Sequence, residues 1–185
     1  SDFEKHYPEF WGEVKEPFEA YYKTEIGKIA VALNFGLKDS VSNVVKLQNF
    51  LIACKGPEEV FAEVASNSSF RKKYFEIKKK YGALLEKAKK IAKRKLIFFE
   101  YSGELSISAD IANEISYLFP NKYIAVAYKK GNITNLSIRG KNVKKILEKI
   151  LKEIGGTGGG HQDAVGARIE TKELEKFKEL LEKDV

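Results

Sequence analysis

The sequence predicts an α/β protein of the α+β kind, with a helical connector followed by a mixed β-sheet domain flanked by helices. Two observations carry this prediction. Up to residue 94, apolar residues recur at three- and four-residue steps, which is typical of amphipathic helices. From residue 95, short apolar runs alternate with helical patterns, which indicates a sheet with helices packed on it. We therefore expect a connector or interaction region over residues 1–94 and a sheet domain over residues 95–185.

The connector is expected to consist of helices separated by short breaks. Pro8, Gly12 and Pro17 prevent a long helix near the start of the chain. A longer basic helix is expected from about Phe70 to Arg94, a length of about 35 Å at the helical rise. The other predicted helices are residues 28–35, residues 41–54 and a segment that starts at Pro57.

The sheet domain is expected to have the order β-α-β-β-α-loop-β-α. The predicted strands are residues 96–101, 123–128, 133–139 and 167–170. Ser108 and Asn142 are expected to cap the first two helices, and a last helix carries Leu174 to Leu181. Lys130-Gly131-Asn132 is typical of a hairpin turn between the second and third strands.

The most unusual stretch is Gly155-Gly156-Thr157-Gly158-Gly159-Gly160-His161, with five glycines in six residues before a histidine. Consecutive glycines can take positive φ, turn tightly and direct several N–H groups at one anion, above all a phosphate. His161 would stand at the rim of this loop with an imidazole able to donate or accept a hydrogen bond. Neither a Walker A sequence nor a dinucleotide-binding fingerprint is present. The alternative is a flexible linker with an isolated histidine.

Positive charge is concentrated in a basic segment, residues 71–95. It holds twelve lysines and arginines against two glutamates, a net charge of +10; because the whole chain carries +7, the remainder carries −3. Such a segment fits a polyanion such as nucleic acid, although a solvated helix face is an equal alternative. The candidate residues for backbone contacts in this segment are Arg71, Lys72, Lys73, Lys78 and Lys79.

A second group of basic residues follows the third predicted strand. Arg139 ends that strand, and its guanidinium can hold a phosphate at two points, which a lysine cannot. Lys141, Lys144 and Lys145 follow directly and extend the positive surface. A surface ion pair is the alternative role for Arg139. Asp163 is expected either to orient His161 or to cap the following turn, and Arg168 is as open to a structural role as to a functional one.

The glycine-rich stretch also carries a family resemblance. Gly158-Gly159-Gly160-His161-x-x-Ala164-x-Gly166 resembles the signature of the DHH-associated domain, the substrate-binding half of DHH phosphoesterases. The resemblance covers residues 95–185 and looks most like archaeal RecJ-like single-strand exonucleases of the GINS-associated type. It implies that Arg139, Gly158, Gly159, Gly160, His161 and Gly166 bind substrate phosphates.

The resemblance implies partners that this sequence does not contain. The hydrolytic centre of the family binds two Mn²⁺ (or Mg²⁺) ions on a larger N-terminal DHH domain. This chain has no Asp-His-His sequence and only two histidines, so we expect no catalytic residue and no metal in it. The expected partners are single-stranded DNA or RNA, the missing DHH domain and the GINS complex, to which a connector of this kind helps to dock.

Three functions stay open from the sequence. The first is the nucleic-acid-binding half of a RecJ-like exonuclease, and the second is a non-catalytic adaptor in an archaeal replication assembly. The third is the C-terminal domain of an alanyl-tRNA-synthetase-like protein, although arginine usually replaces the histidine there. A single cysteine, Cys54, and the absence of a signal peptide or an apolar span indicate a cytoplasmic protein that does not bind membranes.

Overall fold

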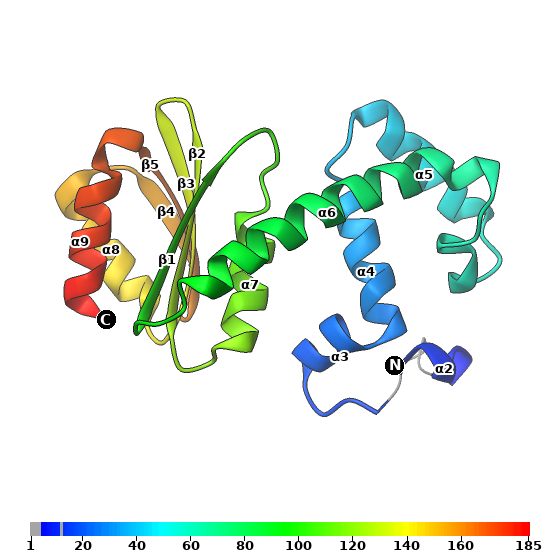
Figure 1. Cartoon of the computed structure of the whole chain (residues 1–185), viewed down its shortest axis with the longest axis horizontal. Coiled ribbons are helices and arrows are strands. Elements are labelled where there is room, and N and C mark those ends of the chain that lie inside the picture. Colours follow the sequence, from blue (N-terminus) through cyan, green and yellow to red (C-terminus); the bar gives the residue numbers. More distant parts are fainter. Residues whose placement is uncertain (1–4, 12) are drawn as a thin grey trace. The chain divides into compact units, whose positions relative to one another are not determined.

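Backbone contacts divide the chain within a long helix. The computed structural model describes residues 5–11 and 13–185, and its two compact units are Ser1–Lys80 and Tyr81–Val185. The helix α6 (Ser68–Lys90) begins in the first unit and ends in the second (Figure 1). It confirms the predicted long basic helix and ends four residues earlier than expected.

The first unit is helical, as predicted. Its remaining elements are α2 (Pro8–Trp11), α3 (Pro17–Lys23), α4 (Glu25–Gly36), α5 (Val41–Ala53) and the 3₁₀ turns η1 (Pro57–Val60) and η2 (Ala65–Asn67). Pro8 and Pro17 stand at the first positions of α2 and α3, where a missing N–H costs nothing. Gly12 lies outside the described residues. The segment predicted to start at Pro57 as a helix forms only one 3₁₀ turn.

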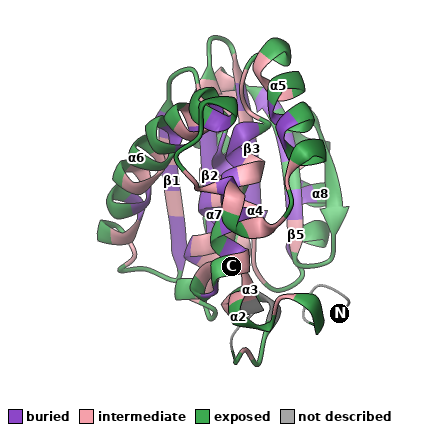
Figure 2. Cartoon of the chain, turned by 90° about the vertical axis from the view of Figure 1, so that its right-hand side faces the viewer, coloured by how far each residue is buried: buried purple, intermediate pink, exposed green. Residues whose placement is uncertain are grey.

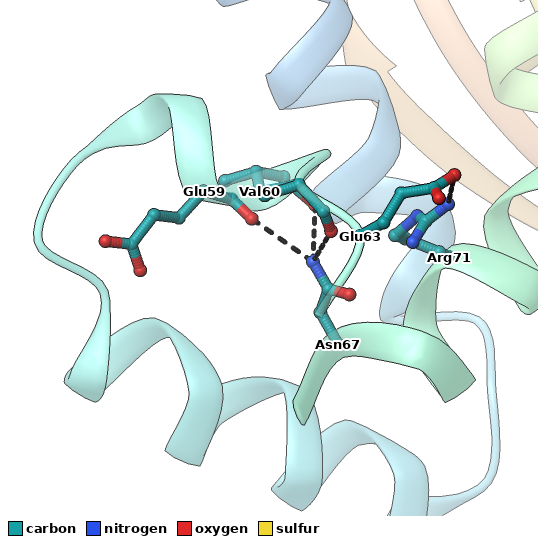
Figure 3. A network of polar contacts seen from close by, with 6 residues as sticks. Glu59, Val60, Glu63, Asn67 and Arg71 are labelled. Carbon is teal, nitrogen blue, oxygen red and sulfur yellow. Dashed lines mark hydrogen bonds and ion pairs between the residues drawn. The ribbon is translucent and has the colours of Figure 1, made fainter. Parts of the chain in front are cut away.

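An aromatic cluster and a buried amide hold the first unit together. Tyr74 on α6 packs against Phe35, Phe61 and Phe70, with ring centroids 5.5–6.4 Å apart. Asn67 Nδ2 donates to the carbonyl oxygens of Glu59, Val60 and Ala62 at 2.8–3.2 Å (Figure 3). This amide therefore ties the η1 turn to the start of α6.

The second unit is a five-stranded mixed sheet. Its strands are β1 (Leu96–Ser102), β2 (Tyr123–Lys130), β3 (Ile133–Arg139), β4 (Thr157–His161) and β5 (Ala164–Glu170), in the order β1-β2-β3-β5-β4. β1 and β2 are parallel and are joined through α7 (Ser108–Leu118), as a parallel pair requires a crossover. All other neighbours are antiparallel. The predicted fold class is confirmed, and β4 is a strand that the sequence analysis took for a loop.

Helices cover both faces of this sheet (Figure 1). The side chains of α8 (Val143–Ile154) and α9 (Leu174–Asp184) pack on one face of β2, β3 and β5. The side chains of α7 and the end of α6 pack on the opposite face of β1 and β2. Successive residues of a strand point to opposite faces of the sheet. The two groups of buried side chains therefore show which residues of each strand face α8 and α9 and which face α7 and the end of α6. The central strands are largely buried, whereas β4 is exposed along its whole length (Figure 2).

Of the two predicted helix caps, Ser108 is wrong, whereas Asn142 does occupy the N-cap position of α8. Ser108 is the first residue of α7 and not its cap, and its buried hydroxyl bonds the Ser137 hydroxyl of β3 at 3.0 Å. Asn142 precedes α8 in the left-handed conformation, with φ 58°, and its side chain makes no capping bond. In both cases the side chain that was predicted to cap the helix contacts another part of the fold instead.

Cys54 is half-buried, and burial, with the nearby Glu59 and Glu58, raises the pKa of its thiol. A raised pKa lowers the thiolate fraction at neutral pH, which makes the thiol a weaker nucleophile under these conditions. None of the described helices is both long and apolar enough to span a membrane.

Candidate functional site

The glycine-rich stretch is the edge strand of the sheet. β4 pairs with β5 in antiparallel register, so that Gly159 lies opposite Gly166 and His161 opposite Ala164. Gln162 and Asp163 alone form the loop between the strands. In a strand, consecutive N–H groups point in opposite directions, so those of Gly158, Gly159 and Gly160 do not converge on one point. This geometry replaces the phosphate-cradling loop expected from the sequence.

The glycines of this strand have different reasons to be glycine. Gly160 has φ 143°, a backbone conformation that other residues rarely adopt. A Cβ at Gly158 would lie 2.7 Å from the Gly166 carbonyl oxygen and 3.0 Å from Leu151 Cδ1. Gly159 has no positive φ, and a Cβ there would meet nothing within 4 Å. The fold therefore accounts for Gly158 and Gly160 but not for Gly159.

The register places the predicted site residues on one surface, which we call the open face. It is the side of β4 and β5 that faces away from α8 and α9, whereas Val165, Ala167 and Ile169 point toward those helices. His161, Ala164 and Arg139 form one row across β4, β5 and β3, because directly opposed residues share a face. Gly159 and Gly166 form the next row and leave the backbone bare. Gly158 and Gly160 belong to the other side of β4.

Arg139 is oriented by contacts that the sequence did not indicate. Its Nε donates to Asn113 Oδ1 of α7 at 2.8 Å. Its Nη1 donates to the carbonyl oxygens of Ile138 at 2.8 Å and Val165 at 3.3 Å. The half-buried guanidinium is thus held at two of its nitrogens, which limits the predicted two-point grip on a phosphate. No sequence signal distinguished Asn113 from other polar residues on the flank of an amphipathic helix.

The hairpin loop fastens β4 to the start of α8. Asp163 Oδ1 accepts from the Asn142 N–H at 2.7 Å, and the Asp163 carbonyl accepts from the Gly140 N–H at 3.0 Å. The Gln162 carbonyl accepts from the Lys144 N–H at 3.1 Å. Asp163 therefore caps the start of α8, an element that precedes it in the chain, and this contact is neither of the two predicted roles. The His161 imidazole makes no hydrogen bond with any other described residue.

Exposed lysines surround the same helix start. Lys141 precedes α8, and Lys144 and Lys145 lie in its first turn, which contains no acidic residue. Lys144 and Lys145 line a shallow pocket of about 350 Å³ with Asn142 and Gln162. Positive side chains at the positive end of a helix lower its stability, so an anion bound here would relieve that repulsion.

The predicted basic residues of α6 belong to a different compact unit from the open face. They lie in the first compact unit, whereas Arg139 and His161 lie in the second. Three of them are engaged: Arg71 with Glu63 at 2.8 Å (Figure 3), Lys73 with Glu76 at 3.7 Å, and Lys78 over the Tyr74 ring at 5.4 Å. Lys72 and Lys79 are exposed, and the side chain of neither has a partner among the described residues.

The described residues do not form a metal site by themselves. In residues 5–11 and 13–185 there is no group of three or more histidine, cysteine, aspartate or glutamate side chains that could hold a metal ion. The open face offers cationic and amide groups, and these suit an anionic ligand.

The model of the DHHA1 domain family matches residues 92–185, about half of the chain. The chain therefore belongs to the DHHA1 domain family, the DHH-associated domain that the glycine-rich motif resembles. The match includes all the sheet and the whole open face. No curated protein matches the chain.

Solved structures of the same fold belong to larger proteins. RecJ from Thermus thermophilus in complex with Mg²⁺ is 15% identical with a TM-score of 0.65, over 96% of this chain and 27% of that one. Exonuclease RecJ bound to manganese is 15% identical with a TM-score of 0.63, over 91% and 41%. The pGpG-specific phosphodiesterase PggH of Vibrio cholerae is 14% identical with a TM-score of 0.57, over 90% and 60%. The chain thus spans between about a quarter and three fifths of these proteins.

Proposed function

We propose that the open face holds the phosphates of single-stranded DNA or RNA in a RecJ-like exonuclease or phosphoesterase. A DHH domain outside this chain would carry the Mn²⁺ or Mg²⁺ centre, and this chain would position the scissile phosphate for it. Positioning of this kind can contribute several kcal/mol to lowering a barrier. We also propose that residues 95–185 bind substrate and that residues 1–94 are the connector.

One observation carries this proposal: His161 and Arg139 share a row beside the Gly159–Gly166 pair. The imidazole and the guanidinium supply donors for phosphate oxygens, and the bare glycines let a ligand lie against the backbone. Lys141, Lys144 and Lys145 extend the positive surface toward the start of α8. Lys72 and Lys79 add further positive charge on α6, with Arg71, Lys73 and Lys78 engaged within the first unit.

A second candidate is the non-catalytic adaptor of an archaeal replication assembly, with the GINS complex as partner. The observation that favours it is the surface of α5, which has one charged residue in thirteen. Val41, Val45 and Ile52 are 81%, 47% and 83% exposed on that helix. Exposed apolar side chains on a nearly uncharged helix suit contact with another protein. Loss of a partner after Val45→Glu and Ile52→Glu, with nucleic-acid binding retained, would support this role.

The phosphate-binding role is tested by titrating the chain with a fluorescent single-stranded oligonucleotide. A few phosphate contacts predict a slope of roughly −2 to −4 for log K against log salt, at about −0.7 per phosphate. His161→Ala should lower the affinity about ten- to a hundredfold, because a charge-assisted hydrogen bond is lost.

His6→Ala is the matched control, because it removes the other histidine of the chain from the first unit. Its affinity should equal that of the parent. Equal affinities for the parent and His161→Ala, with the same melting temperature, would refute the assignment of the open face. An affinity that does not change with salt would refute phosphate contacts.

A further inference from the structure

The open face has a second polar row, four residues along the strands from the row of His161. Arg168 of β5 lies opposite Thr157 of β4 on one side and opposite Asn135 of β3 on the other. Arg168 shares its face with Ala164 and Gly166, because Ala167 and Ile169 point into the core on the other side. The guanidinium therefore belongs to the same surface as His161 and Arg139, at its opposite end.

The Arg168 side chain is available for a ligand. It is exposed, and its guanidinium has no ion-pair or hydrogen-bond partner among the described residues. The next residue of β5 on this face is Glu170, and its carboxylate already pairs with Lys172 at 2.6 Å. The guanidinium thus differs from that of Arg139, which the chain itself holds at two nitrogens.

On β4 and β5 the surface between the two rows carries no side chain, and the β3 residue beside it is the buried Ser137. A Cβ at Gly159 would meet nothing within 4 Å, and one at Gly166 only the Leu136 carbonyl oxygen at 3.6 Å, an ordinary contact. The chain would accommodate small side chains at both positions, so its own packing does not require two glycines here. A path without side chains between two cationic ends fits a ligand that lies along the strands.

The length of this path sets the length of the ligand. Four residues of a strand span about 13 Å. Phosphates follow one another at about 3.4 Å along one strand of duplex DNA, and at that spacing the path corresponds to about four nucleotides. One phosphate cannot be at both ends of such a path, whereas a short oligonucleotide reaches both.

We propose that Arg168 is a second phosphate anchor, so that the open face binds a single strand of about four nucleotides or more. This inference rests on the proposed function, since it takes the row of His161 as the first anchor. Arginine suits the role because its planar fork matches two phosphate oxygens. Thr157 and Asn135 flank it with a hydroxyl and an amide that can donate to the same phosphate.

The test is the dependence of affinity on ligand length. The complete chain is titrated with 5′-phosphorylated oligodeoxythymidylates of one, two, four and eight nucleotides, followed by amide chemical shifts so that millimolar dissociation constants are measurable. The parent should gain affinity between two and four nucleotides. Arg168→Ala should lose that gain, roughly tenfold, and should bind the mononucleotide as the parent does. Arg168→Lys should keep part of it.

The controls separate this inference from the proposed function. Lys183→Ala removes one exposed positive charge from α9, the layer on the other face of the sheet, and should leave every affinity unchanged. His161→Ala should weaken binding at every length. If His161→Ala weakens binding but Arg168→Ala matches Lys183→Ala throughout, the second anchor is refuted alone. The second anchor is also refuted if Arg168→Ala weakens binding of the mononucleotide as much as binding of the tetranucleotide. If His161→Ala has no effect, the proposed function itself fails.

Discussion

Gly159 is the residue whose identity the fold explains least, and this makes it informative. Gly159→Ala should leave the fold intact and raise the free energy of unfolding by up to about 1 kcal/mol, because glycine costs entropy in a strand. Affinity for a single-stranded oligonucleotide should fall if a ligand lies against the bare backbone. Gly158→Ala should instead lower the free energy of unfolding by about 1–3 kcal/mol, since its Cβ would collide with the Gly166 carbonyl.

Urea unfolding and oligonucleotide titration of both variants check this pair. A Gly159→Ala protein that binds as well as the parent would show that the glycine serves no ligand. The positive φ expected for consecutive glycines does not extend to Gly159. The positive φ values of this stretch are at Gly155, Gly156 and Gly160.

At the scale of the element, the β4–β5 hairpin depends on its connection to α8. Asp163→Ala removes the acceptor of the Asn142 N–H and should lower the free energy of unfolding by about 1 kcal/mol, as the loss of a helix cap does. Asp163→Asn keeps an oxygen at that position and should be closer to the parent. Thermal melting checks the order of the three proteins, and equal stability of Asp163→Ala and the parent would contradict the capping role.

The same elements show what the sequence could predict. β1 and β2 were recognised as short apolar runs, β3 by alternation at period 2, and the helices because their apolar side chains repeat at period 3.6. β4 was not, since four of its five residues are Thr157 or glycine with no apolar side chain, and its place in the sheet comes from backbone pairing with β5. The N-cap position of Asn142 was predictable, but the acceptor of its N–H, Asp163, is twenty-one residues away and was not. The periodicity of apolar residues gives no information on such tertiary contacts.

The candidate site was predictable in its residue types but not in its arrangement. His161, Arg139 and the glycines stood out through their composition and through the family motif. Their common row depends on the register of three strands, and that register is fixed by the packing of Ile138, Val165 and Ala167 under α8 and α9. The second row at Arg168 depends on the same register. The contact of Arg139 with Asn113 depends on the packing of α7 on the sheet.

For the whole molecule, the prediction is that this chain alone does not cleave single-stranded DNA or RNA, even with Mn²⁺ or Mg²⁺. Hydrolysis with two metal ions needs a cluster of carboxylates and imidazoles to hold the ions against the phosphate. The chain has only His6 and His161 as imidazoles, and its described residues contain no such cluster. A labelled oligonucleotide incubated with the chain and Mn²⁺ should therefore stay intact on a denaturing gel while it binds. Cleavage that EDTA abolishes and that persists through a further purification would refute the division of binding and catalysis between two domains.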